Sequence, residues 1–499
     1  MELITALLIG SLCLLVYLFL SGRKGKTLPG PYGLPLVGYI PFMSSKPYLD
    51  LQELAKTYGS VFSLHLGSQH CIILDDYQST KDAFAQDAFL GRPPENPFDL
   101  RKATLETGAF NGLPWKEQRR FSLQMLKDLG FGKSHLEDMI KEEIHDLLDH
   151  LGKSNGQPVE VKPVLAPSMS NNIASLVFGK RLKYEDPVRK MLDKSLTESA
   201  NAAGQVTWQL FFPWLARVAK FLRLGNEGII AQLLKDTRDY TLKEIEEHER
   251  TLDPNNLRDY IDGYLVEIGK RNDPAFCKEV LEDMIGTFFG AGSETVRLSV
   301  NWLVLTMAAR QDIQKKVQQE IDNVIGTERL PSWDDHKKMP FTEATIMELM
   351  RWRTIVPINI LRYTLWDTEL NGFFIPKDSY VLANLWSIHH NPKYWGEDAE
   401  EFRPERFLTE DRNEVIKSEY FIPFSIVHFV IMDKSSEKQV SDRVQANLMP
   451  ARTEVFLYFT AILQKFDISL PEGAKPDFYG QLGIGLGPKP YKVSLKKRF

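Results

Sequence analysis

The sequence contains very little cysteine. Among its 499 residues only Cys13, Cys71 and Cys277 carry a thiol. So few cysteines at such wide spacing exclude a disulfide framework and a cysteine-rich metal domain. Because no cysteine follows residue 277, the carboxyl-terminal part of the chain cannot supply a thiolate ligand to a metal ion.

The sequence also lacks an excess of basic charge and any internal repeat. It has 61 basic and 66 acidic side chains and a net charge of −5, whereas proteins dedicated to nucleic acids usually have a basic excess. We therefore expect no nucleic-acid partner. Hydrophobic residues make up 43% and charged residues 25%, which excludes wholesale disorder and a multi-span membrane protein. The absence of a repeat excludes solenoids and propellers.

One long apolar run is present, at the amino terminus. Residues 3–20 are uncharged, and as a helix they would be about 27 Å long, enough to cross a bilayer core. Arg23, Lys24 and Lys26 follow at once, and basic residues keep their end of such a helix in the cytoplasm. We predict an uncleaved transmembrane anchor over residues 1–22, with the rest of the chain in the cytosol. The alternative is a cleaved signal peptide, but a positive n-region is absent and a secreted product would usually carry more cysteine.

Residues 23–40 are basic and proline-rich. Within them, residues 28–38 read LPGPYGLPLVG, in which prolines cannot extend a helix and glycines permit sharp turns. We expect a stiff, bent hinge that sets the following body at a fixed angle to the membrane. A plain linker would have a similar composition.

The remaining residues, 41–499, have the pattern of one large and mostly helical domain. A β-hairpin is predicted where apolar runs at 61–66 and 70–74 flank a turn. Two further short strands are expected on either side of Glu369–Gly372. Helical periodicity marks the longer segments 136–152, 228–250, 278–309 and 311–326. The fold class is therefore mainly α with small β-sheets, an α+β arrangement.

The long helix predicted over 278–309 has charged ends and an apolar middle, so we expect it to cross the centre of the body. Gly290 and Gly292 lie inside it, each at a cost of about 1 kcal/mol relative to alanine, which indicates that something approaches its backbone closely. One candidate is a flat cofactor, with Glu294 and Thr295 relaying protons. The other is a crossing helix, with Glu294 and Thr295 as ordinary polar residues. The residues alone favour the crossing helix.

Glu348 and Arg351 are three residues apart, on one face of a predicted helix. Their neighbours are apolar, which indicates burial, and a buried ion pair needs further partners to offset the loss of hydration. Arg406, within Pro404–Phe407, supplies a second guanidinium. We interpret these residues as a structural ion-pair cluster rather than a catalytic group.

Five motifs occur in an order and at spacings that resemble those of a known family. They are Trp115–Phe121, Ala291–Thr295, Glu348 with Arg351, Pro404–Phe407 and Phe421–Phe424. With the anchor and the hinge before them, the chain resembles the cytochrome P450 family of haem-thiolate monooxygenases over nearly its whole length. It is most similar to animal members anchored in the endoplasmic reticulum, of the clan that includes family two.

The resemblance implies a haem cofactor and assigns residues to it. Trp115 and Arg119 are similar to the pair that hydrogen-bonds a haem propionate, for which an indole N–H and a guanidinium are suitable donors. Arg362 is similar to a further propionate partner. Gly292 is similar to the residue that lets the long helix pass over the porphyrin.

The same resemblance implies catalytic residues and a reaction. Glu294 and Thr295 are similar to the acid–alcohol pair that manages protons during oxygen activation. Glu348, Arg351 and Arg406 are similar to the family's structural triad. The implied reaction inserts one oxygen atom from O2 into an apolar small-molecule substrate, with electrons from NADPH through a flavoprotein reductase. The implied location is the endoplasmic reticulum membrane, which the chain contacts through a single-pass amino-terminal helix in the lipid, with the catalytic domain in the cytosol.

The segment 425–450 departs from the family. The family pattern that starts at Phe424 is Phe-x-x-Gly-x-x-Arg-x-Cys-x-Gly. The residues at the positions of the glycine, arginine, cysteine and glycine are Val427, Val430, Met432 and Lys434. Family-like sequence resumes at Ala451, after a segment longer than the family's. The segment is therefore replaced rather than point-mutated, either by a different splice form or exon boundary or in a paralogue that has lost its haem loop.

Loss of the cysteine has a chemical consequence. An axial thiolate donates the electron density that favours O–O cleavage. Met432 and His428 carry groups that can bind haem iron, but neither is a thiolate, and we treat their positions as coincidental. We assign no metal ligand. The expected function is a haem-dependent monooxygenase that is impaired in this chain, and haem binding itself is in question. The alternative is a membrane-anchored non-catalytic paralogue, or a splice or gene-model variant, that binds an apolar ligand or partner.

Overall fold

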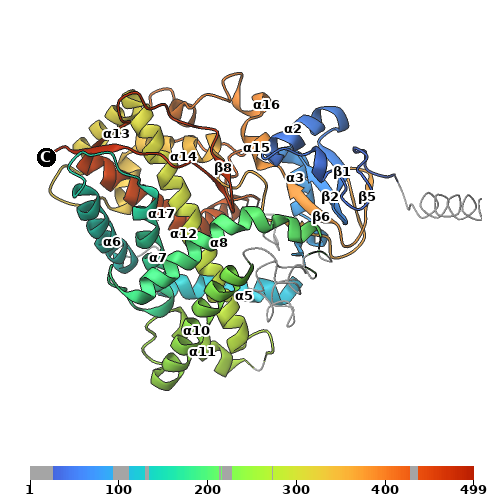
Figure 1. Cartoon of the computed structure of the whole chain (residues 1–499), viewed down its shortest axis with the longest axis horizontal. Coiled ribbons are helices and arrows are strands. Elements are labelled where there is room, and N and C mark those ends of the chain that lie inside the picture. Colours follow the sequence, from blue (N-terminus) through green and yellow to red (C-terminus); the bar gives the residue numbers. More distant parts are fainter. Residues whose placement is uncertain are drawn as a thin grey trace, which may run out of the picture. The chain divides into compact units, whose positions relative to one another are not determined.

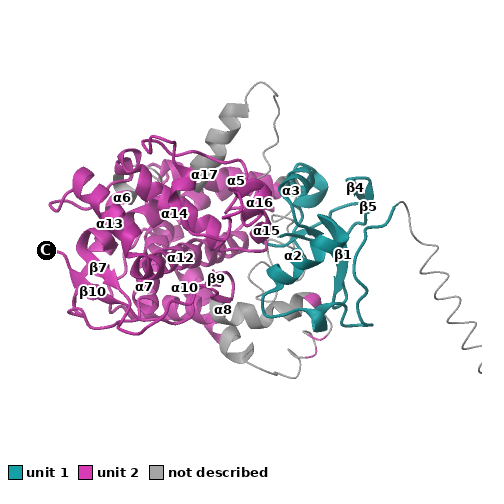
Figure 2. Ribbon diagram, turned by 90° about the horizontal axis from the view of Figure 1, so that it is seen from above, with its two compact units in different colours: residues 1–93, 360–384 teal, residues 94–359, 385–499 magenta. Residues whose placement is uncertain are grey.

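The structure is a computed structural model and describes residues 26–93, 112–129, 134–212, 215, 218, 227–271, 273–426 and 437–499. Contacts divide the described residues into two compact units (Figure 2). The smaller unit comprises residues 26–93 and 360–384, and the larger unit comprises the other described residues. The prediction of one domain over residues 41–499 stays a prediction.

The smaller unit is built on a four-stranded sheet with the strand order β1-β2-β6-β3 (Figure 1). Its strands are β1 Val61–Leu66, β2 Gln69–Leu74, β6 Tyr380–Ala383 and β3 Arg362–Tyr363. Strands β1 and β2 pair in antiparallel fashion, which confirms the predicted hairpin, and His65 lies directly opposite His70. Strand β6 runs parallel to β2 and antiparallel to β3.

A second hairpin completes the strands of the smaller unit, as the sequence predicts. Strand β4 (Thr368–Leu370) pairs with β5 (Phe373–Ile375), and the turn residues Asn371 and Gly372 have φ angles of 52° and 78°. Positive φ at both positions is typical of the two-residue turn that matches the twist of antiparallel strands. The helical elements are η1 Ile40–Phe42, α2 Pro47–Tyr58, α3 Tyr77–Phe84 and η2 Asp87–Leu90.

The described part of the proline-rich hinge, from Lys26 onward, is attached to strand β1. The carbonyl of Pro29 accepts a hydrogen bond from the N–H of Ser63 at 2.8 Å. A Cβ on Gly30 would lie 1.7 Å from the Ser63 carbonyl oxygen, so only glycine permits this close approach. Because these contacts hold the segment to the sheet, it differs from a plain linker.

The larger unit is mainly helical. Its longer helices are α5 Gly112–Asp128, α6 Ser134–Gly152, α7 Lys162–Phe178, α8 Pro187–Phe211, α10 Glu227–Thr251, α11 Tyr260–Lys270, α12 Lys278–Ala309, α13 Gln311–Val324, α14 Pro340–Trp352 and α17 Glu437–Lys465. Its short helical elements are η3 Trp333–Lys338, α15 Leu385–His389, α16 Pro392–Trp395 and η4 Pro404–Phe407. Two small sheets pair β7 Phe466–Ser469 with β10 Ser494–Lys497 and β8 Gln481–Leu482 with β9 Leu486–Gly487. The four long helices expected from periodicity are all present, which confirms a mainly α fold with small sheets.

Helix α12 is the central element of the larger unit. It has 32 residues and contacts α7, α17, α10, α13 and α14, as a helix through the core must. Its carboxyl-terminal half, from Val296 to Ala308, is buried throughout. Burial of so long an apolar stretch stabilises the helix far more than its intrinsic propensity does.

Within the described ranges, no helix combines the length and the apolar character that crossing a bilayer requires. The predicted anchor, residues 1–22, lies outside the described residues.

Candidate functional site

The predicted ion-pair cluster is present at the end of α14. Arg351 donates from Nε to Glu348 Oε2 at 2.7 Å and from Nη2 to Oε1 at 2.8 Å, so the pair is bidentate. Arg406 donates from Nε to Glu348 Oε1 at 2.9 Å. Glu348 and Arg351 are 0% exposed and Arg406 is 5% exposed. The interpretation as a buried structural cluster is confirmed.

Further hydrogen bonds satisfy the charges of this cluster. The second guanidinium nitrogen of Arg351 donates to the carbonyls of His389 at 2.6 Å and Ala399 at 2.8 Å. The backbone N–H of Arg403 donates to Glu348 Oε1 at 2.9 Å. Such additional partners offset the desolvation that a buried ion pair incurs. The cluster therefore ties helix α14 to the loop that carries η4.

His389 extends this network toward the segment that departs from the family, and the sequence contained no signal for it. The N–H of Ile422 donates to His389 Nε2 at 3.1 Å, and Nδ1 lies 2.9 Å from Thr354 Oγ1. Because the Thr354 hydroxyl donates to the carbonyl of Arg351, it must accept from Nδ1–H, which leaves a lone pair on Nε2. Burial lowers the pKa of His389 well below its usual value, in agreement with a neutral ring.

Helix α5 brings Trp115 and Arg119 together, as the resemblance implies. The Arg119 guanidinium lies over the Trp115 ring at 5.2 Å, and both side chains are half-buried. Among the described residues, no hydrogen bond or ion pair satisfies this guanidinium. Burial without a carboxylate partner lowers the pKa of Arg119. The site is therefore suited to an anionic group from outside the described residues.

The middle of α12 presents an open face. Ala291 is exposed and Thr295 half-exposed, although the helix is otherwise mostly buried around them. The Thr295 hydroxyl donates to the carbonyl of Ala291 at 2.9 Å. Phe288, one turn earlier on the same face, is also partly exposed. An apolar face with one hydroxyl therefore lies at the centre of the larger unit.

Glu294 points away from this open face. Its carboxylate is held by Arg297, which donates from Nε at 2.8 Å and also from Nη2, and both side chains are almost fully buried. Successive residues of a helix are about 100° apart around its axis, so Glu294 and Thr295 cannot share one face. Ser293 Oγ and Arg297 Nη1 have no partner among the described residues, and both side chains line a small cavity with Asp193 of α8.

Gly292 lies at the crossing of α12 and α7. A Cβ built on it would be 2.7 Å from Ile173 Cδ1, whereas one on Gly290 would meet nothing within 4 Å. This contact is the one that the crossing-helix alternative expects. It accounts for the glycine without a cofactor, and a role for Gly292 against a porphyrin stays a prediction.

Arg362 belongs to the smaller unit, where it begins strand β3. Its guanidinium lies over the ring of Phe84 at 4.6 Å. The structure thus brings Trp115 and Arg119 together in one unit and places Arg362 in the other. The role of Arg362 at a propionate stays a prediction.

The described cysteines are unsuited to bind a metal as thiolates. Cys71 is fully buried in β2, and burial raises its pKa to about 12. Cys277 precedes α12, and partial burial raises its pKa also. Metal binding and nucleophilic reactivity require the thiolate, which these environments disfavour. Cys13, His428 and Met432 lie outside the described residues.

The segment that replaces the haem loop is described only in part. Ser425 has a φ of 63°, and the chain is next described at Glu437, where α17 begins. Helix α17 then runs unbroken to Lys465 and includes Ala451, where family-like sequence resumes. Helix α17 therefore begins within the segment that departs from the family.

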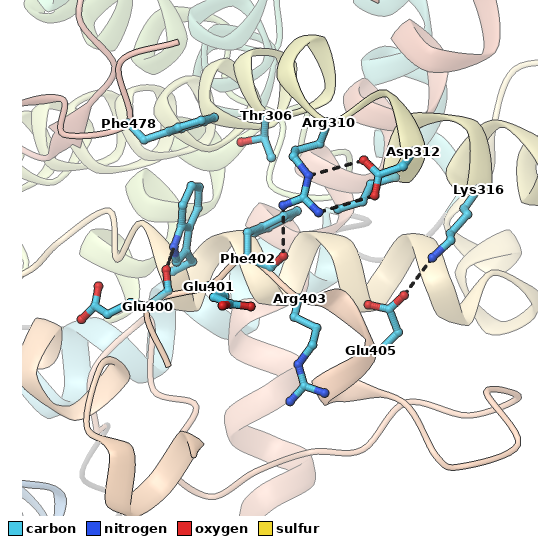
Figure 3. Close-up of a pocket in the computed structure, with 12 residues that line it drawn as sticks. Thr306, Arg310, Asp312, Lys316, Glu400, Glu401, Phe402, Arg403, Glu405 and Phe478 are labelled. Carbon is cyan, nitrogen blue, oxygen red and sulfur yellow. Dashed lines mark hydrogen bonds and ion pairs between the residues drawn. The ribbon is translucent and has the colours of Figure 1, made fainter. Parts of the chain in front are cut away.

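A surface pocket of about 430 Å³ lies elsewhere in the larger unit (Figure 3). Its three basic lining residues are each paired with an acid: Arg310 with Asp312, Lys316 with Glu405 at 2.9 Å, and Arg403 with Asp398 at 2.6 Å. Glu400 and Glu401 also line the pocket and accept hydrogen bonds through their backbone carbonyls. We assign no chemistry to this pocket.

Comparison with known proteins decides the family. A model of the cytochrome P450 family matches residues 28–426. The chain belongs to the cytochrome P450 family. It is 36% identical to cytochrome P450 18a1 of Drosophila melanogaster over 98% of this chain and 91% of that protein. It is 35% identical to cytochrome P450 2U1 of Rattus norvegicus, over 99% of this chain and 95% of that protein. It is 33% identical to cytochrome P450 2J2 of Homo sapiens, over 98% of this chain and 95% of that protein.

Membership in the cytochrome P450 family implies a haem cofactor and monooxygenase ancestry, and the residues present fit that cofactor only in part. The guanidinium of Arg119, which has no hydrogen-bond or ion-pair partner among the described residues, suits a propionate, and the open face around Ala291 suits a flat apolar group. The axial ligand does not fit, because the family match ends at residue 426 and no cysteine follows residue 277. We therefore derive no oxygen-transfer step for this chain.

Proposed function

We propose that this chain is a cytochrome P450 whose oxygen-inserting activity toward an apolar substrate is impaired by the loss of the thiolate ligand. The observation that carries the proposal is the end of the family match at residue 426, directly before the segment that contains the family's cysteine. A methionine stands at the cysteine's position, and a thioether cannot supply an anionic thiolate. In this proposal the chain keeps the fold but loses the thiolate-dependent activation of oxygen.

The residues assigned to the cofactor are part of this proposal. Trp115 and Arg119 would hold one propionate, since a guanidinium pairs strongly with a carboxylate and Arg119 has no such partner among the described residues. Arg362 would hold a further propionate. The open face of α12, with Thr295, would lie toward the porphyrin and the substrate, and haem, when bound, would supply the redox chemistry.

Glu294 has a more restricted role than the acid–alcohol pattern suggests. Arg297 holds its carboxylate on the side of α12 that faces α7 and α8. To deliver a proton toward Thr295, Glu294 would have to break its ion pair with Arg297. The buried guanidinium would then be without its carboxylate, which is unfavourable. Glu294 and Thr295 are therefore proposed as a pair that acts only after this ion pair opens.

Location and redox partner follow from the same family. We propose an anchor at residues 1–22 in the endoplasmic reticulum membrane and the hinge at residues 23–40, with the body in the cytosol. An NADPH-dependent flavoprotein reductase would be the electron donor, docking on the basic side chains of α5. Lys116, Arg120 and Lys127 supply that charge.

A non-catalytic role is the second candidate, and one observation favours it. The parts that hold the fold, above all the Glu348–Arg351–Arg406 cluster, are complete, whereas the segment that holds the iron is replaced. A chain with this combination keeps the apolar face around Phe288 and Ala291 for a ligand or partner.

Replacement of residues 425–450 by the loop of a cytochrome P450 with its cysteine tests the proposal. The native full-length chain and the grafted chain are each mixed with haem in detergent, and the haem retained after gel filtration is measured. We expect stoichiometric retention by the graft and substoichiometric retention by the native chain. Arg119→Ala in the graft should reduce retention if Arg119 holds a propionate. Equal, stoichiometric retention by both chains would show that haem binding does not need the cysteine. A thiolate-type carbon monoxide spectrum of the native chain would refute the proposal.

The second candidate is distinguished by ligand binding without haem. An environment-sensitive fluorescent fatty acid reports occupancy of an apolar site in the native chain. Saturable binding that Ala291→Lys abolishes would support a ligand-binding role, because the lysine places a charge on the open face of α12. Binding unaffected by Ala291→Lys would argue against a site on that face.

A further inference from the structure

Two histidines face each other across the β1–β2 hairpin of the smaller unit. His65 of β1 and His70 of β2 are directly opposed in the antiparallel register, so their side chains lie on the same face of the sheet. Their ring centres are 5.3 Å apart, with the planes inclined by 49°. Two imidazoles bound to one tetrahedral metal ion through bonds of about 2.0 Å have ring centres about 5 Å apart. The hairpin thus holds the rings at the separation that a shared metal ion needs.

The hydrogen bonds of His70 select the tautomer that can bind a metal. Its Nδ1 lies 3.1 Å from Ser379 Oγ. The Ser379 hydroxyl donates its hydrogen to the carbonyl of Pro376 at 2.9 Å, so it must accept from Nδ1–H of His70. Nε2 of His70 therefore carries a lone pair. Histidine ligands in metal sites are usually oriented in this way by a hydrogen bond from the other ring nitrogen.

An ion from solvent can also reach both histidines. His65 is exposed and His70 half-buried, so an ion can reach both rings from solvent. A histidine binds a metal ion through the lone pair of a neutral ring. The contact with Ser379 leaves that lone pair on Nε2 of His70.

We propose that His65 and His70 form a binding site for one divalent transition-metal ion of the nickel, copper and zinc group. His70 supplies Nε2, His65 supplies one ring nitrogen, and water completes the coordination. Imidazole pairs suit these ions and not Ca²⁺ or Mg²⁺, which prefer oxygen ligands. The ion would join the two strands of the hairpin and so stabilise the folded state, by an amount that rises with the logarithm of its concentration above the Kd. This site is independent of the haem chemistry proposed above.

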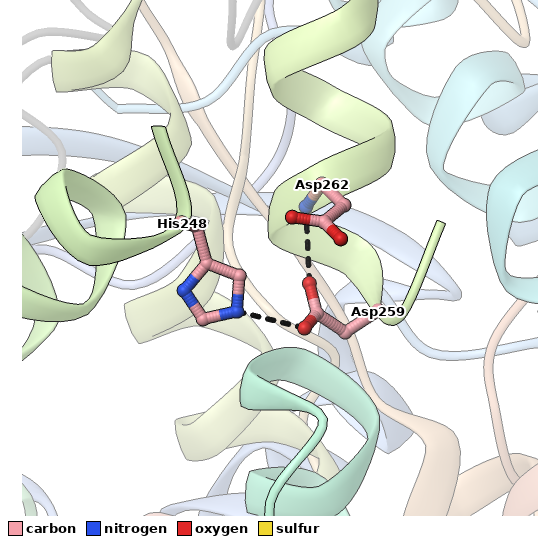
Figure 4. A group of neighbouring side chains, drawn as sticks. All are labelled: His248, Asp259 and Asp262. Atoms are coloured by element: carbon pink, nitrogen blue, oxygen red, sulfur yellow. Dashed lines mark hydrogen bonds and ion pairs between the residues drawn. The ribbon is translucent and has the colours of Figure 1, made fainter. Parts of the chain in front are cut away.

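A second cluster, around His248, lacks the free lone pair that a metal ion needs. His248, Asp259 and Asp262 lie close together in the larger unit (Figure 4). However, His248 Nδ1 is 2.7 Å from the Glu244 carbonyl and Nε2 is 2.8 Å from Asp259 Oδ2, so both ring nitrogens act as donors. Asp262 accepts two hydrogen bonds from the Arg258 side chain at 2.7 Å. This cluster is an internally satisfied ion-pair network and carries no metal proposal.

Metal titration of the full-length chain, produced without a histidine tag, tests the proposal. Binding of Zn²⁺ is followed by competition with a chromophoric chelator, and Cu²⁺ is added separately for electron paramagnetic resonance. We expect one saturable site and a copper spectrum with hyperfine splitting from two imidazole nitrogens. His65→Ala and His70→Ala should each abolish the site. Ser379→Ala should weaken it by about tenfold, the lower end for loss of a group that orients a metal ligand.

A matched control and two contrary outcomes complete the experiment. His145 is exposed and 3.9 Å from Asp149, so His145→Ala removes an adventitious histidine–carboxylate pair and should leave the affinity unchanged. Because His65 is exposed, His65→Ala should fold normally, which circular dichroism checks. Unchanged zinc affinity in His65→Ala would overturn the proposal. So would loss of the site in Asp262→Asn with the site retained in His70→Ala, because the metal would then occupy the cluster of Figure 4.

Discussion

The backbone N–H of Ile422 donates a hydrogen bond to Nε2 of the fully buried His389. This bond joins the end of the buried Glu348–Arg351 network to the segment that leads into residues 425–450. The buried network around Glu348 therefore extends to Ile422, shortly before the family match ends at residue 426.

His389→Ala should destabilise the protein through this bond. The substitution removes the acceptor of the Ile422 N–H together with the contacts of a fully buried ring, which should cost about 1–3 kcal/mol. Urea unfolding should show a lower midpoint. His145→Ala, on an exposed histidine, should change the midpoint little. A midpoint in His389→Ala equal to that of the native chain would show that the bond contributes nothing.

Glu348→Ala should be more damaging than loss of any exposed acid. It leaves the guanidinium groups of Arg351 and Arg406 buried and without their carboxylate, which costs about 3–5 kcal/mol. The yield of folded protein and the unfolding midpoint should both fall. The matched control is Glu185→Ala, which removes an exposed partner of Lys190. Equal effects of the two substitutions would contradict the structural role of the cluster.

Two buried histidines predict loss of stability in acid. Burial lowers the pKa of His390 to about 3 and that of His389 well below its usual value, whereas histidines of the unfolded chain titrate near 6.5. Below about pH 6.5 the unfolded state therefore binds protons that the folded state does not. The free energy of unfolding should fall with pH by up to about 1.4 kcal/mol per unit for each histidine. In His389→Gln the slope should be less steep, because one of the contributing histidines is gone, while His145→Gln should keep the native slope.

The buried Glu454 predicts that stability also falls when the pH is raised. Burial raises the pKa of this carboxyl group to about 8, and its Oε2 has no hydrogen-bond partner among the described residues. Between pH 4.5 and 8 the folded state holds a proton that the unfolded state releases, so stability falls as the pH rises through this range. Glu454→Gln removes that loss. Between pH 6.5 and pH 8 the free energy of unfolding of Glu454→Gln, relative to that of the native chain, should therefore rise by up to about 2 kcal/mol.

The exposed Glu472 provides the control for this measurement. Glu472→Gln should follow the native curve at every pH. A native-like decline above pH 6.5 in Glu454→Gln would assign the titration to another group.

The periodic parts of the fold could be predicted from the sequence. Helix α12 has the bounds that its charged ends and apolar middle predict, and both hairpins form where turn residues separate apolar runs. The Glu348–Arg351 pair was also predictable, because an acid and a base three residues apart lie on one face of a helix. In each case the information is local in the sequence.

The rest depends on contacts that sequence spacing does not encode. The parallel pairing of β2 with β6 joins Cys71 to Tyr380, about three hundred residues away, through backbone groups that every residue shares. No local motif marks His389 as the hydrogen-bond acceptor of the Ile422 N–H. The position of Gly292 against Ile173 likewise required the fold.

The pairing of Glu294 with Arg297 did leave a signal that sequence reasoning missed. The two residues have the same three-residue spacing as Glu348 and Arg351, and the helical period separates Glu294 from Thr295. The family pattern directed attention to the adjacent pair instead. Helical spacing therefore identifies the partner of Glu294 more accurately than adjacency does.

The central claim is that no thiolate of this chain reaches a haem iron. The most direct test is the absorption spectrum of the full-length chain, reconstituted with haem, reduced and exposed to carbon monoxide. The account predicts that the red-shifted Soret band of a thiolate-ligated carbonyl haem is absent, and that replacing residues 425–450 by a cysteine-containing family loop creates it. A thiolate band in the native chain that disappears in Cys71→Ser or Cys277→Ser would contradict the account.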